Sequence, residues 1–96
     1  MKRKGRLFDK IVRAVNEAHF LVSSHAADRF EERGLEIEEL IGGLQASRSI
    51  EERPRSKPNA SIRVRQTLTD GTEVDVIWSW LEHGDRALLV TAFLDE

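Results

Sequence analysis

The chain has 96 residues and a formal net charge of −2, with 40% hydrophobic and 33% charged side chains. This length allows one modest hydrophobic core, so we expect a single domain over residues 1–96. No apolar run approaches the ~20 residues that cross a bilayer, and cysteine is absent. These features predict a cytoplasmic protein without a membrane segment, a disulfide or a thiolate metal site.

The charge is divided into blocks of alternating sign. Residues 1–19 sum to +4, 20–47 to −4, 48–69 to +4 and 70–96 to −6. Proteins that grip nucleic-acid phosphates without sequence preference are usually basic overall, so the total charge argues against that class. The two positive blocks still allow a local basic patch.

Apolar periodicity predicts two helices in the first half of the chain. Between 6 and 18, apolar residues recur at i, i+3, i+4 and i+7, which is the pattern of an amphipathic helix. The same spacing recurs over 35–44, where early glutamates suit a helix N-terminus. Gly42 and Gly43 weaken the last turn of this second segment.

A shorter helix is predicted between them, over about 25–33. It follows the short extended segment HFLV, and Ser23 or Ser24 can cap its N-terminus with a hydroxyl. Gly34 fits the left-handed position just past its end. Because positions i and i+4 lie one above the other on a helix, a histidine and two arginines at 25, 29 and 33 share one face.

The second half of the chain has the alternation of an antiparallel meander. A proline-containing loop over 53–61 precedes two alternating segments joined by Asp70–Gly71, which is a strong signal for a β-hairpin. A second reversal at Glu82–Asp85 leads into the apolar ALLVTAFL, and a further strand is expected at about 48–52. The sequence therefore predicts an α+β fold, with N-terminal helices packed on an antiparallel sheet of three or four strands.

Two segments resemble a known bacterial family. SSHAADRFEERGLEIEELI and the final LLVTAFLDE are similar to the family catalogued as domain of unknown function 4258, over residues 20–96. The positions that match its pattern are Ser23, His25, Ala26, Arg29, Arg33, Gly34, Thr91 and Ala92. The family is similar to the RelE-like toxin ribonucleases, which implies helices on a curved antiparallel sheet and leaves residues 1–19 as an extra N-terminal helix.

The resemblance and the helical spacing together indicate a metal-independent endoribonuclease or RNA-binding site. His25 would take the proton of a ribose 2′-hydroxyl, Arg29 and Arg33 would hold the phosphate, and Thr91 would add a hydroxyl. The competing interpretation is structural. In it, His25 braces the sheet and the arginines pair with Asp28 or another carboxylate.

A basic patch on the predicted hairpin is a second candidate for nucleic-acid contact. Its members are Arg53, Arg55, Lys57, Arg63 and Arg65, with Trp78 on the next strand as a stacking platform for bases. The same alternation also fits tryptophan in the core and arginine in water.

Two function classes therefore stay open. One is a toxin-type endoribonuclease or RNA-binding domain whose partner is RNA. The other is a noncatalytic interaction module of the same fold that binds an antitoxin-like protein chain. His19, His25 and His83 are too scattered for a metal site, so no metal and no other cofactor is expected.

Overall fold

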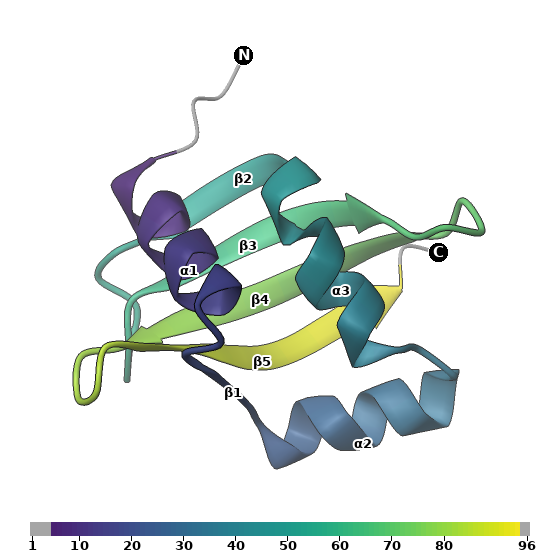
Figure 1. The fold of residues 1–96 in the computed structure, drawn as a ribbon, viewed down its shortest axis with the longest axis horizontal. Helices are drawn as coiled ribbons and strands as arrows, with labels where there is room; N and C mark the ends of the chain where they lie inside the picture. Colours follow the sequence, from purple (N-terminus) through teal and green to yellow (C-terminus); the bar gives the residue numbers. More distant parts are fainter. Residues whose placement is uncertain (1–4, 95–96) are drawn as a thin grey trace.

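The computed structural model describes residues 5–94, in which helices pack on one face of a five-stranded sheet (Figure 1). In chain order the elements are α1 (Arg6–Asn16), β1 (Phe20–Val22), α2 (Ser24–Arg33), α3 (Ile37–Gly43), a 3₁₀ turn (Leu44–Ala46), β2 (Arg48–Arg53), β3 (Ser61–Thr67), β4 (Glu73–Leu81) and β5 (Arg86–Leu94). The α+β class and the helices expected from periodicity are confirmed. None of the helices in the described part of the chain has the length and apolarity to cross a membrane.

The sheet has the strand order β1-β5-β4-β3-β2, which is one strand more than the three or four expected. Strands β2 to β5 form the predicted antiparallel meander. The extra strand is the HFLV segment, which pairs parallel with β5 in the register Phe20↔Ala87. This pairing makes β5 an interior strand, in agreement with its apolar residues on both faces.

Helix α2 begins and ends where its cap residues predict. The Ser23 hydroxyl accepts a hydrogen bond from the Ala26 N–H at 3.0 Å, so Ser23 and not Ser24 is the N-cap. The same hydroxyl donates to the Val90 carbonyl at 2.8 Å, which ties the start of α2 to β5. Gly34 ends the helix in the left-handed conformation, with φ of 67°.

Helix α1 takes its N-terminal acceptor from β2. The N-cap residue Gly5 has no side chain to offer, and the Glu52 carboxylate accepts a hydrogen bond from the Phe8 N–H at 2.7 Å. A Cβ atom on Gly5 would meet this carboxylate, so the Glu52 side chain would have to shift to admit any other residue. An ionic acceptor from the sheet edge thus fixes where α1 starts.

The β3–β4 hairpin turns at Asp70–Gly71 as predicted. The Leu68 N–H donates to the Thr72 carbonyl at 2.7 Å, and Asp70 Oδ1 accepts from the Thr72 N–H at 2.9 Å. Gly71 has φ of 91°, a conformation that suits glycine. The second predicted reversal joins β4 to β5 between Leu81 and Arg86.

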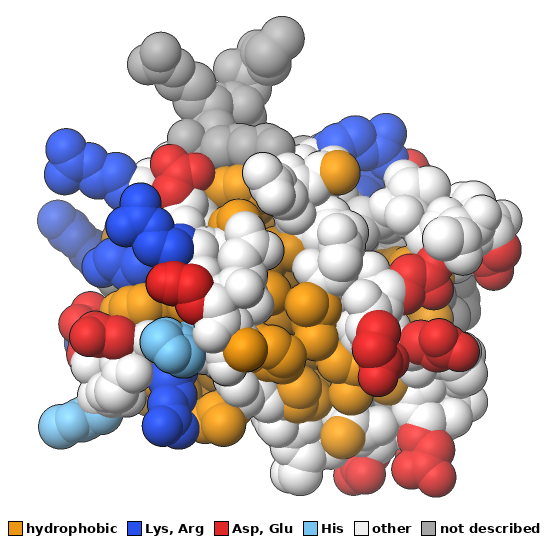
Figure 2. Space-filling view, in the orientation of Figure 1, with side chains coloured by type: hydrophobic (Ala, Val, Ile, Leu, Met, Phe, Trp, Pro, Cys, Tyr) orange, Lys and Arg blue, Asp and Glu red, His pale blue; other side chains and the backbone are white. Residues whose placement is uncertain are grey.

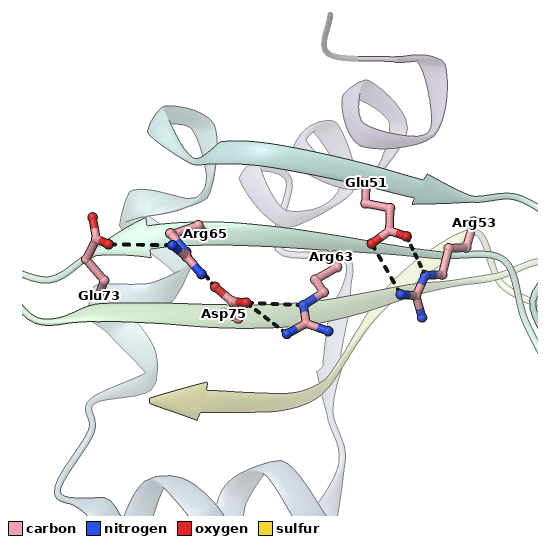
Figure 3. A network of polar contacts seen from close by, with 6 residues as sticks. All are labelled: Glu51, Arg53, Arg63, Arg65, Glu73 and Asp75. Carbon is pink, nitrogen blue, oxygen red and sulfur yellow. Dashed lines mark hydrogen bonds and ion pairs between the residues drawn. The ribbon is translucent and has the colours of Figure 1, made fainter. Parts of the chain in front are cut away.

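The hydrophobic core lies between the helices and one face of the sheet. Its largest fully buried side chains are Trp78, Phe30, Ile11, Leu40, Leu44, Ile62, Leu89, Val64, Val74 and Val76. The opposite face of the sheet carries charged side chains from β2, β3 and β4, and the helices lie behind the sheet when it is seen from that side (Figure 3).

Candidate functional site

Helical spacing places the three side chains of the α2 stripe along one flank of the helix, next to its buried side. Ala26 and Phe30 anchor the inner side, with exposed fractions of 0% and 2%. His25 and Arg33 are exposed and Arg29 is half-buried. A histidine and two guanidinium groups, one and two turns further on, therefore lie along one flank of a helix that the core holds in place.

Within the described part of the chain, these three side chains lack polar partners. Among residues 5–94, none of the three makes a hydrogen bond or an ion pair, and Asp28 is likewise unpaired. The pairing of Arg29 and Arg33 with Asp28 or another carboxylate, which the structural alternative expects, is not found among residues 5–94. Three polar groups are therefore free to meet a ligand.

Thr91 lies on β5, the strand against which α2 packs, but its side chain is enclosed. Only 6% of the residue is exposed. Its Oγ1 atom is buried and has no hydrogen-bond partner among the described residues. The accessible members of the predicted catalytic set are therefore His25, Arg29 and Arg33, whereas the Thr91 hydroxyl is enclosed.

The arginines of β3 are held by a carboxylate of β4 (Figure 3). Asp75 Oδ2 accepts from Arg63 Nη2 at 2.9 Å, and Asp75 Oδ1 accepts from Arg65 Nε at 2.8 Å. These bonds, that from Arg65 first, lower the pKa of Asp75 below the usual value for aspartate. The side chain of Asp75 is only 14% exposed, and each of its two oxygens accepts a hydrogen bond from a different arginine.

The rest of the predicted basic patch is divided between paired and unpaired groups. Arg53 pairs with Glu51 at 3.2 Å, and Arg48, beside the patch, pairs with Glu73. The carboxylates neutralise much of the positive charge on this face of the sheet, which weakens its attraction for phosphates. Arg55 and Lys57 lie exposed in the loop between β2 and β3.

The assignment of Trp78 as a stacking platform is wrong. Trp78 is 0% exposed and packs edge-on against Phe20, with ring centroids 6.4 Å apart. A base cannot reach its indole ring. The aromatic ring that the sheet does expose is Phe93, which is 40% exposed with Arg63 Cζ 5.7 Å from its centroid. Alternation along β5 offered a signal for Phe93, because its neighbour Ala92 points into the core.

A cavity of about 460 Å³ lies elsewhere on the molecule, between α1 and the end of β4. None of the residues that line it belongs to α2. In the described part of the chain, no group of three or more histidine, aspartate or glutamate side chains is placed to hold a metal ion.

The family described as "Domain of unknown function (DUF4258)" matches residues 22–94. The chain belongs to this family. The expected membership of the DUF4258 family is thereby confirmed, and the matched region contains the whole α2 stripe and the meander β2–β5 but leaves α1 outside. No curated protein and no solved structure gives a significant match to the chain.

Proposed function

We propose that this DUF4258 domain binds RNA along α2 and cleaves it there. The observation that supports this proposal is the stripe of His25, Arg29 and Arg33, which makes no hydrogen bond or ion pair within residues 5–94. Arginines that serve only solubility can lie anywhere on a surface. These three groups instead lie at four-residue intervals on a helix that the core anchors, so they can act together on one ligand. RNA carries both a phosphate for the arginines and a 2′-hydroxyl for the imidazole.

The proposed reaction is a transesterification within the RNA chain. The ribose 2′-oxygen attacks the adjacent phosphorus while its proton passes to His25. The bond from phosphorus to the 5′-oxygen breaks, and that oxygen takes a proton from water. Arg29 and Arg33 stabilise the charge that develops on the phosphoryl oxygens. The products are a 2′,3′-cyclic phosphate and a 5′-hydroxyl end.

The similarity to RelE-like toxin ribonucleases belongs to the same proposal. It is supported by the helix motif at His25, Arg29 and Arg33 and by the order of helices followed by a meander. In a toxin of this kind the protein partner is an antitoxin-like chain that covers the site. The proposal then predicts that such a chain blocks RNA cleavage.

The test is cleavage and binding of an RNA oligonucleotide by purified variants. We expect His25→Ala to lower the cleavage rate by roughly 10²–10⁴-fold with little change in affinity, because proton transfer contributes that range. Arg29→Gln and Arg33→Gln should weaken binding as well as turnover, and the loss should shrink at high salt. Arg48→Gln, which removes the same charge from the sheet, is the matched control and should leave both unchanged.

Thermal unfolding separates function from structure in this experiment. Exposed groups without partners should cost little stability, so each variant should melt within a few degrees of the wild type. If the wild type neither cleaves RNA nor binds it in a salt-sensitive way, while the three α2 variants melt well below it, the stripe is structural and the proposal fails.

A second candidate is a noncatalytic protein-interaction module. It is favoured by the sheet face that the helices leave uncovered, where Phe93 is 40% exposed and the charges are already paired. Leu21 on β1 is another large exposed apolar side chain, at 43%. In this case Phe93→Ser should abolish binding of a protein partner, while the α2 variants should have no effect on it.

A further inference from the structure

The α2 stripe lies on the same side of the molecule as the open face of the sheet, which is the face opposite the helices. In Figures 1 and 3, α2 lies beside β5 and beyond the edge of the sheet. Figure 2 is seen from the helix side, and over α2 it shows acidic side chains but no basic or histidine side chains of the described residues. The cations of α2 therefore point toward the open face.

The helical positions around Arg29 agree with this placement. Phe30 comes next in the chain and points into the core, whereas Asp28 comes just before and is exposed. Because successive residues lie about 100° apart around a helix, the stripe lies between the core side of α2 and an acidic side. Glu32, one turn beyond Asp28, continues that acidic side and is also exposed. The stripe thus has the sheet on one flank and carboxylates on the other.

Phe93 is the large apolar side chain that β5 exposes on the open face. Its cross-strand partner is Asp75, whose carboxylate holds Arg63 and Arg65 on that face. The neighbouring Ala92 is buried, so alternation along β5 turns Phe93 away from the core. The Arg63 guanidinium lies 5.7 Å from the centroid of the ring, and 40% of Phe93 is still exposed. A flat ligand can therefore reach this ring.

Phe93 comes level with the middle of the stripe. The Ser23 hydroxyl at the start of α2 donates to the Val90 carbonyl at 2.8 Å, and from this contact α2 and β5 run in the same direction (Figure 1). Arg29 lies about 9 Å further along the helix. Phe93 lies about 10 Å further along the strand. The cations of α2 and the ring of Phe93 therefore border the same stretch of surface, where β5 meets α2.

The two sides of this surface suit different parts of a nucleotide. Arg29 and Arg33 make no hydrogen bond or ion pair within residues 5–94, so they can bind a phosphate. The arginine beside Phe93 is Arg63, and Asp75 already holds it. An exposed aromatic ring binds bases by stacking, which needs an unpaired base and tolerates any sequence. The phosphate therefore fits the α2 side and the base fits the β5 side.

We infer that the site takes single-stranded RNA and that a base next to the cleaved bond stacks on Phe93. This inference rests on the proposed cleavage at α2. A base inside a duplex is paired and stacked on its neighbours, so it cannot cover the ring. The carboxylates of Asp28 and Glu32 also repel the phosphates of a second strand. Phe93 is a binding residue, and the α2 stripe supplies the chemistry.

A tryptophan reporter tests the stacking on the full chain. The variant Phe93→Trp adds an exposed indole, while Trp78 and Trp80 are 0% and 6% exposed and give a constant background. The ligand is a 2′-O-methyl RNA oligonucleotide, which has no free 2′-hydroxyl to attack the phosphate and stays intact. It should quench the added emission to saturation. Leu21→Trp is the matched control, because Leu21 is 43% exposed on β1, and its emission should not change.

Affinity measurements distinguish stacking from phosphate binding. Phe93→Leu keeps an apolar side chain but removes the ring, and should weaken binding of the same oligonucleotide about tenfold. That loss should be equal at low and high salt, whereas the loss in Arg29→Gln should shrink as salt is raised. A duplex of the same sequence should bind about tenfold more weakly than the single strand. Thermal unfolding within a few degrees of the wild type establishes that each variant is folded.

Three results would overturn the inference and leave cleavage at α2 intact. They are a Phe93→Trp variant that binds RNA without quenching, a Phe93→Leu variant that binds as tightly as the wild type, and a duplex bound as tightly as the single strand. The proposed function fails by a different result, in which the wild type neither cleaves RNA nor binds it in a salt-sensitive way. The inference would then fail with it.

Discussion

The exchange Asp75→Asn removes the negative charge that holds Arg63 and Arg65 on the face of the sheet opposite the helices. The carboxylate accepts hydrogen bonds from Arg63 Nε and Nη2 at 3.2 and 2.9 Å and from Arg65 Nε at 2.8 Å. Asparagine has nearly the same shape but leaves two guanidinium groups beside each other with no charge between them. The variant should therefore lose stability without a change of packing.

The exposure of the two arginines limits how much stability the Asp75→Asn variant should lose. A hydrogen bond to a charged group contributes about 1.5–3 kcal/mol when it is buried. The side chains of Arg63 and Arg65 are 41% and 34% exposed, so solvent screens much of this interaction. We expect a total loss of about 2 kcal/mol in the free energy of unfolding. For a domain of this size that corresponds to a fall of about 8–16 °C in the melting temperature.

The contribution of Asp75 to the free energy of unfolding should depend on pH in a direction that its lowered pKa fixes. The hydrogen bonds from Arg65 and Arg63 hold the pKa of Asp75 in the folded chain below the ordinary value for aspartate, so the unfolded chain binds more protons between the two pKa values. The contribution of Asp75 to stability is complete above the unfolded pKa and is lost as pH falls through the folded pKa. The difference between wild type and Asp75→Asn should therefore be constant near pH 7 and vanish at strongly acid pH.

Urea unfolding at a series of pH values measures both effects. Asp28→Asn is the control, because Asp28 is exposed and makes no hydrogen bond within residues 5–94. It should match the wild type across the whole range. An Asp75→Asn variant as stable as the wild type at pH 7, or one whose deficit persists unchanged in strong acid, would refute the reasoning.

Three further predictions concern the fold. Glu52→Ala removes the acceptor of the Phe8 N–H and should cost about 1 kcal/mol in urea unfolding, with early loss of amide protection in α1. Gly34→Ala has room for its methyl group but must adopt φ of 67°, and should cost about 1 kcal/mol in the same assay. Trp78→Ala empties the centre of the core and should cost about 3–5 kcal/mol, and a loss below 1 kcal/mol would contradict the burial of Trp78.

Features of local chemistry could be predicted from the sequence. The caps of α2 depend on Ser23 and Gly34, which act within a few residues of their own position. The Asp70–Gly71 turn likewise sets the register of its hairpin. That register places Arg65 opposite Asp75, so this ion pair could also have been derived from the position of the turn.

Features that depend on distant pairing could not be predicted. A three-residue strand such as β1 has too few residues to show alternation, and it becomes a strand only because β5 offers an edge. Alternation in β4 left open whether Trp78 faced the core or a ligand, because the pattern defines two faces but not which one the helices cover. The cavity at Trp80 arises only when α1 docks beside the β4–β5 turn.

The most direct measurement of the central claim is a map of where RNA binds. In ¹H–¹⁵N NMR spectra of the full chain, addition of a short RNA oligonucleotide should shift the amide signals of α2, with the largest changes from His25 to Arg33. The shifts should decrease as salt is raised. Absence of any shift, or shifts confined to the sheet face around Arg63 and Phe93, would contradict RNA recognition by the α2 stripe.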